Sequence, residues 1–350
     1  MKCKFVTNET PSSVLSRIKE ILSRGHNVTY KKVAIWGYGF VVAAVLFGMI
    51  YLLSVSTGTP LDNETLQISD EELLAVLKVP NGTVSVPISN LEELLPPAAS
   101  DPAWRSYAAS WRGSDKNRIA IVIDDLGLDQ DMSRQFALIE GPLTLAFLPY
   151  AERLPEQAEM VRRGGHELLV HLPMEPKNDK ADPGPNALLS TVDYAEFERR
   201  IDWNLTRFKG FVGINNHMGS SLTENPGLMV RLMVQLRKNG YLFLDSLTSP
   251  NSVGERAAAA TGVPHIERDI FLDNERNITA ILAQLYRTER IAKKRGYAIA
   301  IGHPYPETMK ALQFWAAKLD HTKFSLVPVS QLVAARVASE KLAKSQVSKK

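Results

Sequence analysis

Residues 119–127 read IAIVIDDLG, an apolar run that ends in Asp124 and Asp125, and this pattern decides the fold. Similar runs follow at Leu143–Leu148, Leu168–Val170, Phe211–Ile214, Tyr241–Leu244, Val263–Ile266, Tyr297–Ile301 and Phe324–Val327. The stretches between them predict helices near 131–140, 154–163, 194–208, 226–239, 252–260, 278–295 and 307–319. Continuous apolar strands that alternate with helices indicate a parallel sheet buried on both faces. We therefore expect an α/β fold, a (β/α) barrel of about seven units, with a doubly wound open sheet as the alternative.

Polar side chains gather where these predicted strands end. They are Asp124 and Asp125, His171 with Glu175 in its loop, Asn215, Asn216 and His217, Asp245, and His303. The carboxyl ends of barrel strands open on one face, where active sites are built, so the pattern predicts one polar site. A single strand-end carboxylate such as Asp245 is equally explained as a helix cap, and His265 as a core histidine. Arg268 and Asp269 either line the mouth or form an ordinary ion pair.

The residue types in this set are those of a metal-dependent hydrolase. Imidazole and carboxylate are the preferred nitrogen and oxygen ligands of zinc and related divalent ions. Neighbouring side chains on a strand point to opposite sides, so Asp124 and Asp125 reach one site only if the strand end turns. One carboxylate then binds metal and the other acts as a base, while His303 from across the barrel is a candidate general acid.

Five segments resemble those of the divergent polysaccharide deacetylase family, a branch related to metal-dependent carbohydrate esterases. They are IAIVIDDLG (119–127), GHELLVHLPMEP (165–176), GINNHMGS (213–220), LFLDS (242–246) and IAIGHPYPET (299–308). The resemblance covers about 118–335 and implies a barrel of about seven units, a divalent metal and removal of N- or O-acetyl groups from glycans. It also implies that Asp124 is the base, that Asp125 and His171 are metal ligands, and that His303 assists the leaving group.

The chain departs from the parent pattern at the third ligand. Glu175 stands where the parent superfamily has its second histidine, and the Arg-Pro motif after the fourth strand is replaced by the sequence from Asn215 to Gly219. Two ligand sets remain open: Asp125, His171 and His217, with Glu175 outside them, or Asp125, His171 and Glu175. Asn215, Asn216 and Asp245 are then candidates for substrate contact or for supporting the ligands.

The first third of the 350-residue chain predicts a membrane anchor. Residues 33–55 carry no charge and are long enough to cross a bilayer as a helix. The preceding residues 1–32 hold seven Lys or Arg and two Glu, which predicts a cytoplasmic leader and places all that follows outside. Residues 56–117 are proline-rich and predict a periplasmic stalk, residues 118–335 the barrel, and residues 336–350 a basic tail.

The net charge of +3 is concentrated at the two ends of the chain, and the part between them is acidic, which argues against a nucleic-acid groove. The single cysteine, Cys3, excludes a disulfide framework within the chain. The sequence thus predicts a single-pass inner-membrane, periplasm-facing deacetylase of an envelope polysaccharide that uses zinc, or nickel, cobalt or manganese. The alternative is a weakly active or inactive barrel that binds a glycan or an envelope partner.

Overall fold

A computed structural model describes residues 95–111, 113 and 116–347, and these contain a curled parallel sheet. Its strands are β1 (Arg118–Leu126), β2 (Thr144–Phe147), β3 (Glu167–Met174), β4 (Gly213–Met218), β5 (Leu242–Asp245), β6 (His265–Glu267), β7 (Ile270–Phe271), β8 (Tyr297–Gly302) and β9 (Ser325–Leu326). The order is β6-β5-β4-β3-β2-β1-β8-β7, with β9 paired to β1, and every pairing is parallel. This order follows the chain around a ring, as in a barrel, and the reversal of a doubly wound sheet does not occur in it.

The ring is closed by the chain and not by hydrogen bonds between its end strands. β6 and β7 lie at opposite ends of the hydrogen-bonded order, yet only Arg268 and Asp269 separate them in sequence. The Arg268 N–H donates to Asp245 O on one side, and the Asp269 N–H donates to Ile299 O on the other. One extended segment therefore spans the gap, and the architecture is an incompletely closed α/β barrel.

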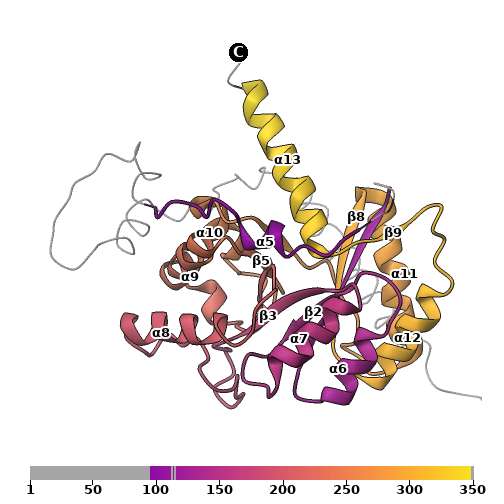
Figure 1. Cartoon of the computed structure of the whole chain (residues 1–350), viewed down its shortest axis with the longest axis horizontal. Helices are drawn as coiled ribbons and strands as arrows, with labels where there is room; N and C mark the ends of the chain where they lie inside the picture. Colours follow the sequence, from indigo (N-terminus) through magenta and orange to yellow (C-terminus); the bar gives the residue numbers. More distant parts are fainter. Residues whose placement is uncertain (1–94, 112, 114–115, 348–350) are drawn as a thin grey trace, which may run out of the picture. The chain divides into compact units, whose positions relative to one another are not determined.

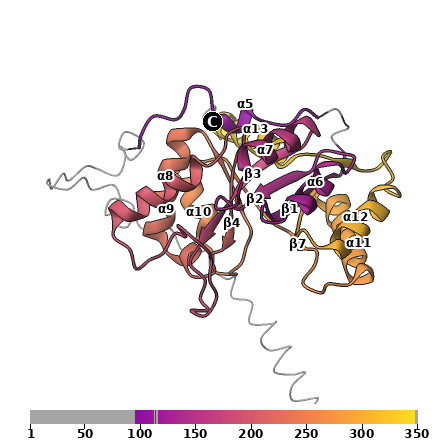
Figure 2. The ribbon, with the colours of Figure 1, turned by 60° about the horizontal axis from the view of Figure 1, so that its bottom comes forward.

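Helices cover the outside of this sheet, with α8, α9 and α10 on one side and α11 and α12 on the other (Figures 1 and 2). The helices are α5 (Ala103–Ser106), α6 (Gln130–Ala137), α7 (Leu154–Arg163), α8 (Tyr194–Leu205), the 3₁₀ turn η2 (Leu222–Glu224), α9 (Pro226–Asn239), α10 (Gly254–Thr261), α11 (Ile278–Arg295), α12 (Pro306–Ala316) and α13 (Val329–Val347). Side chains of Asp129, Asp193, Asn225 and Asn277 cap the starts of α6, α8, α9 and α11. These caps fix where four helices begin, directly after the loops that form the mouth of the barrel.

Alternation along β1 divides the core into two layers. Ile119, Ile121 and Ile123 pack outward against the helices, whereas Ala120 and Val122 belong to a smaller cluster inside the barrel. Trp104 and the first turns of α13 join this inner cluster, the latter through Val329, Leu332 and Val333. The interior is therefore filled from the end opposite to the carboxyl ends of the strands, and the polar mouth is the other end.

The described part of the predicted stalk packs against the barrel. Trp104 is 4% exposed, its backbone N–H donates to Gly240 O, and Arg237 Nε donates to Pro96 O. At the other end, α13 runs past residue 335 and extends away from the barrel (Figure 1). Residues 1–32, the predicted span 33–55 and residues 56–94 lie outside the described residues. Among the helices that are described, none is long and apolar enough to cross a membrane.

Candidate active site

A distortion at the end of β1 brings both of its aspartates to the mouth. The register with β2 shifts between Ile123 and Leu126, and Asp125 has a left-handed backbone with φ of 56°. A non-glycine residue rarely adopts this conformation, and it turns Asp125 out of the alternation of the strand. Asp124 is buried at 2% exposure, while the Asp125 side chain is 31% exposed. The strand end thus presents two carboxylates to one site.

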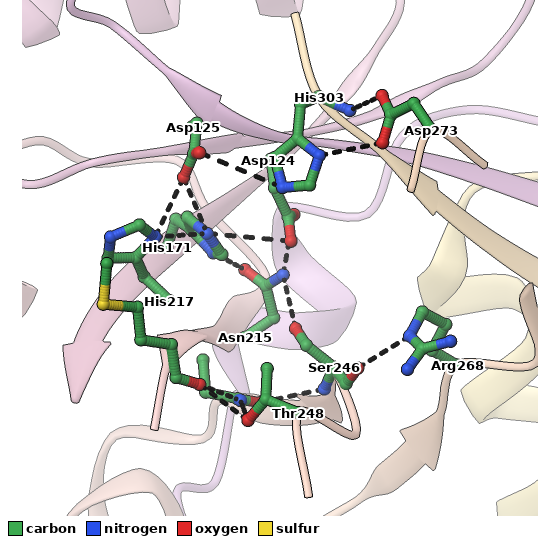
Figure 3. A network of polar contacts seen from close by, with 12 residues as sticks. Asp124, Asp125, His171, Asn215, His217, Ser246, Thr248, Arg268, Asp273 and His303 are labelled. Carbon is green, nitrogen blue, oxygen red and sulfur yellow. Dashed lines mark hydrogen bonds and ion pairs between the residues drawn. The ribbon is translucent and has the colours of Figure 1, made fainter. Parts of the chain in front are cut away.

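Three side chains from β1, β3 and β4 converge at this point (Figure 3). Asp125 Oδ1 lies 2.9 Å from His217 Nδ1 and 3.2 Å from His171 Nε2. The two imidazole nitrogens are 3.2 Å apart. All three atoms lie within 4.8 Å of one another, which is the spacing of a group able to hold a metal ion. The spacing brings together Asp125, His171 and His217 as one of the two ligand sets left open by the sequence.

The surroundings of this group fit a divalent cation. Asp125 Oδ1 is buried and receives no hydrogen bond of acceptable geometry, so one of its lone pairs is uncommitted. His171 Nδ1 is 2.9 Å from Asn215 Oδ1 and donates to it, which fixes the tautomer and leaves Nε2 facing Asp125. Two nitrogens and one carboxylate oxygen, with a fourth position left for water or substrate, are a donor set typical of catalytic zinc.

The site also favours positive charge electrostatically. Burial lowers the pKa of His171, but the charges of Asp124 and Asp125 outweigh burial and raise the pKa to about 9. Burial raises the pKa of Asp125, but the imidazoles of His171 and His217 outweigh it and hold the pKa well below its ordinary value. A proton and a divalent cation therefore compete for the same place beside these carboxylates.

Asp124 is the second carboxylate and lies beside the triad. Its Oδ1 accepts a hydrogen bond of 2.8 Å from Asn215 Nδ2, and its Oδ2 is 3.7 Å from His171 Nε2. Burial raises the pKa of Asp124, partly opposed by His171. The same Asn215 amide also reaches Ser246 Oγ at 3.2 Å. Asn215 therefore links the Asp124 carboxylate to His171, a member of the triad.

His303 faces the triad from β8 and is backed by a carboxylate that the sequence analysis missed. Its Nε2 is 3.9 Å from Asp125 Oδ2, and its Nδ1 is 2.9 Å from Asp273 Oδ1. Asp273 is buried and also accepts from the His303 N–H at 2.6 Å and from Thr308 Oγ1 at 2.7 Å. Burial lowers the pKa of His303, but Asp273 outweighs it and raises the pKa. The arrangement directs Nε2 of His303 toward the site, and the contact with Asp273 favours the protonated form of the imidazole.

Glu175, the other candidate ligand, lies outside the triad. Its carboxylate accepts a hydrogen bond from the Ser190 N–H. Its backbone N–H donates to Leu188 O, and its carbonyl accepts from Ser221 and Leu222. Glu175 thus belongs to the loop after β3, where it holds that loop in place.

Two further predicted site residues, Asn216 and Asp245, hold the loop after β5. Asn216 Oδ1 accepts from the Ser246 N–H, and its Nδ2 donates to Met218 O. The Asp245 carboxylate accepts from the Leu247 N–H at 2.8 Å and from Ser252 Oγ. These contacts place Ser246, which the sequence analysis did not single out, beside Asn215.

The remaining candidates behave as ordinary structural residues or line the edge of the mouth. Arg268 donates from Nε to Ser246 O and from Nη2 to Leu247 O, so its guanidinium is fixed beside the loop after β5. Asp269 forms an ion pair with Arg295, away from the triad. His265 is 6% exposed and makes a hydrogen bond to Val263 O, as expected for a core histidine.

Fold and site together define an α/β-barrel protein with a candidate divalent-cation site at the carboxyl ends of its strands. The chain belongs to the divergent polysaccharide deacetylase family, whose model matches residues 121–333. The family resemblance predicted from the sequence is thereby confirmed.

Three relatives are similar to this chain. The protein YibQ of Escherichia coli K12, described as uncharacterized, is 39% identical over 196 residues, which are 56% of this chain and 61% of that protein. An uncharacterized protein of Haemophilus influenzae is 33% identical over 57% of this chain and 70% of its own length. The crystal structure of an uncharacterized protein from Agrobacterium tumefaciens has a TM-score of 0.64 at 30% identity, covering 68% of this chain and 98% of that one. The match therefore spans less than two thirds of the E. coli relative.

Proposed function

We propose that the barrel is a metal-dependent deacetylase that hydrolyses N- or O-acetyl groups of a polysaccharide. One observation carries the proposal: Asp125, His171 and His217 converge on one point beside a second buried carboxylate and an imidazole backed by Asp273. Membership of the divergent polysaccharide deacetylase family supports a glycan as the substrate.

Asp125, His171 and His217 would hold the metal, which we propose to be zinc, with nickel, cobalt or manganese as alternatives. A divalent ion supplies a Lewis acid that polarises an acyl carbonyl and makes nearby water more acidic. The carboxylate of Asp125 and the two imidazoles leave the ion part of its positive charge, which this chemistry requires.

Asp124 and His303 then divide the proton transfers. Asp124 accepts a proton from the water that attacks the acyl carbonyl, and its raised pKa brings it closer to the working pH of a general base. His303 donates the proton on Nε2 to the leaving nitrogen or oxygen as the bond to the acyl carbon breaks. Asp273 holds the Nδ1 proton of His303, so the transferable proton is the one on Nε2.

We further propose that the enzyme works outside the cytoplasm at the inner membrane. The uncharged stretch 33–55 and the basic leader 1–32 support an anchor with a cytoplasmic N-terminus. Reporter fusions after residue 60 test this topology. Alkaline phosphatase activity together with a dark cytoplasmic fluorescent reporter is expected, and the reverse pattern contradicts it.

The test of the activity is acetate release by the purified full-length chain from N-acetylglucosamine oligomers. The chain is stripped with a chelator and reloaded with zinc, nickel, cobalt or manganese. We expect turnover with at least one metal, its loss in His217→Ala, and no change in His321→Ala, which removes an exposed histidine remote from the triad. Bound metal and bound glycan without turnover would instead support a binding protein.

A further inference from the structure

Beside His303 the mouth carries a row of neighbouring, mutually tilted rings, Phe271, His303 and Tyr305, which we call the aromatic row. The ring centroids of Phe271 and His303 are 5.0 Å apart, and those of His303 and Tyr305 are 5.5 Å apart. Guanidinium groups stand at both ends: the Arg268 Cζ lies 5.2 Å from the Phe271 centroid, and the Arg276 Cζ lies 3.6 Å from the Tyr305 centroid. One aromatic ring therefore separates His303, the candidate general acid, from a guanidinium group on each side.

The two arginines differ in what remains available to a ligand. Arg268 is half-buried and donates to two backbone carbonyls of the loop after β5. Arg276 is exposed, and no acid of the described residues forms an ion pair with it. The guanidinium lies over the Tyr305 ring, and its N–H groups donate no hydrogen bond to another described residue. A stacked arginine in this state suits the planar, bidentate recognition of a carboxylate or phosphate.

The chemistry of the reaction indicates which part of a substrate meets this row. His303 protonates the leaving group, so the sugar that keeps the nitrogen or oxygen lies on the His303 side. Tyr305 and Arg276 continue the same wall away from the triad. A neutral glycan gains no charge-assisted contact from the exposed guanidinium of Arg276, whereas an acidic substituent on the adjoining sugar does.

We infer that Arg276, held on Tyr305, selects an anionic polysaccharide, one whose sugar next to the acetylated residue carries an acidic group. The inference rests on the proposed deacetylase function and names the substrate class of that site. Arg276 acts on specificity, and the proton transfers remain with Asp124 and His303.

The test compares two N-acetylated tetrasaccharides that differ in charge. Chitin tetrasaccharide is neutral, and hyaluronan tetrasaccharide alternates N-acetylglucosamine with glucuronate. The metal-loaded full-length chain is expected to prefer hyaluronan in kcat/KM. Arg276→Ala is expected to lower the ratio of the two kcat/KM values about tenfold, which is the scale of one charge-assisted hydrogen bond. Arg276→Lys keeps the charge but loses the planar fork, so its ratio of kcat/KM values is expected to lie between those of the wild type and Arg276→Ala. Added salt is expected to reduce the wild-type preference for hyaluronan.

Arg105→Ala is the matched control, because Arg105 also lies over an aromatic ring, that of Trp104, at 4.0 Å but away from the mouth. It is expected to leave the ratio unchanged. An Arg276→Ala ratio equal to that of the wild type, in a protein with an unchanged melting temperature, would overturn the inference while the deacetylase function stands.

Calorimetric binding of the two tetrasaccharides distinguishes a failure of the proposed catalysis from a failure of the inferred selectivity. If neither sugar is turned over, but hyaluronan binds more tightly than chitin and Arg276→Ala removes the difference, the selectivity stands and the proposed catalysis fails. If the two bind equally or not at all, the inference is wrong.

Discussion

Asp273 is the residue through which the proposed general acid can be tested most cleanly, since it touches His303 and not the candidate metal ligands. Asp273→Asn keeps the size of the side chain and removes its charge. The carboxylate accepts three hydrogen bonds, two of them from His303. An amide has one acceptor oxygen, so its NH₂ group must face a donor or turn away. His303 Nδ1 then loses its charged partner, and the imidazolium loses its stabilisation.

The expected loss follows from these contacts. General acid catalysis contributes about 10²–10⁴-fold, and we expect kcat for acetate release to fall within that range. The folded protein should lose about 1.5–3 kcal/mol, the scale of one hydrogen bond to a charged group. Thr308→Val is the control, because it removes one hydrogen bond to Asp273 and leaves both contacts with His303. It should share the destabilisation but keep most of the activity.

The pH dependence provides a second readout with a defined sign. Asp273 raises the folded-state pKa of His303 above the ordinary value of 6.5. The resulting stabilisation is complete below the unfolded pKa and is lost as the pH rises through the folded one. Activity depends on the same ionisation, because the general acid must be protonated. In Asp273→Asn, the alkaline limb of the pH–activity profile is therefore expected to move to lower pH. Wild-type kcat and an unmoved alkaline limb in a folded Asp273→Asn variant would refute the role of His303 and Asp273.

Three further predictions address the ligands and the core. Asn215→Ala leaves His171 Nδ1 and Asp124 without their shared hydrogen-bond partner. The affinity for the metal, measured against a competing chelator, should therefore fall about 10–100-fold. An unchanged affinity would show that Asn215 does not orient His171. Metal binding must displace a proton from His171, because burial is outweighed by Asp124 and Asp125, which raise the pKa of His171 to about 9. The affinity for the metal should therefore rise with pH up to about 9, and calorimetry in two buffers should detect proton release. Metal binding that does not depend on pH would contradict this prediction. Trp104→Ala should lower the free energy of unfolding, measured with denaturant, by about 3–5 kcal/mol, because Trp104 packs in the inner cluster. A loss under about 1 kcal/mol would mean that this packing contributes little to the stability of the barrel.

The sequence predicted the barrel because its long strands carry a strong local signal. Ile119–Ile123 and Tyr297–Ile301 are apolar runs that no helix period explains, and they became β1 and β8. The run Phe324–Val327 likewise contains β9, whereas β7 has only two residues, too few for a periodic pattern, and was not predicted. The plug formed by Trp104 and α13 was also not predicted, because it joins segments more than two hundred residues apart, and no local periodicity reports such contacts.

The site was predictable where a polar residue directly ends a long strand. The convergence of Asp124, His171 and His303 at one mouth was predicted in this way. Asp273 was missed since it follows the two-residue strand β7, although its place in FLDN after an apolar pair is the same signal in weaker form. Strand-end position could not decide between Glu175 and His217. That choice depends on which way each side chain points after its strand, and the backbone of Glu175 is committed to the loop after β3.

The central claim is that Asp125, His171 and His217 hold a divalent ion. A zinc-loaded crystal structure of the protein tests it most directly. We predict an ion about 2.0–2.2 Å from a carboxylate oxygen of Asp125, from His171 Nε2 and from His217 Nδ1, with Glu175 outside the coordination sphere. An ion bound by Glu175 in place of His217, or no ion at this point in crystals with excess zinc, would contradict the account.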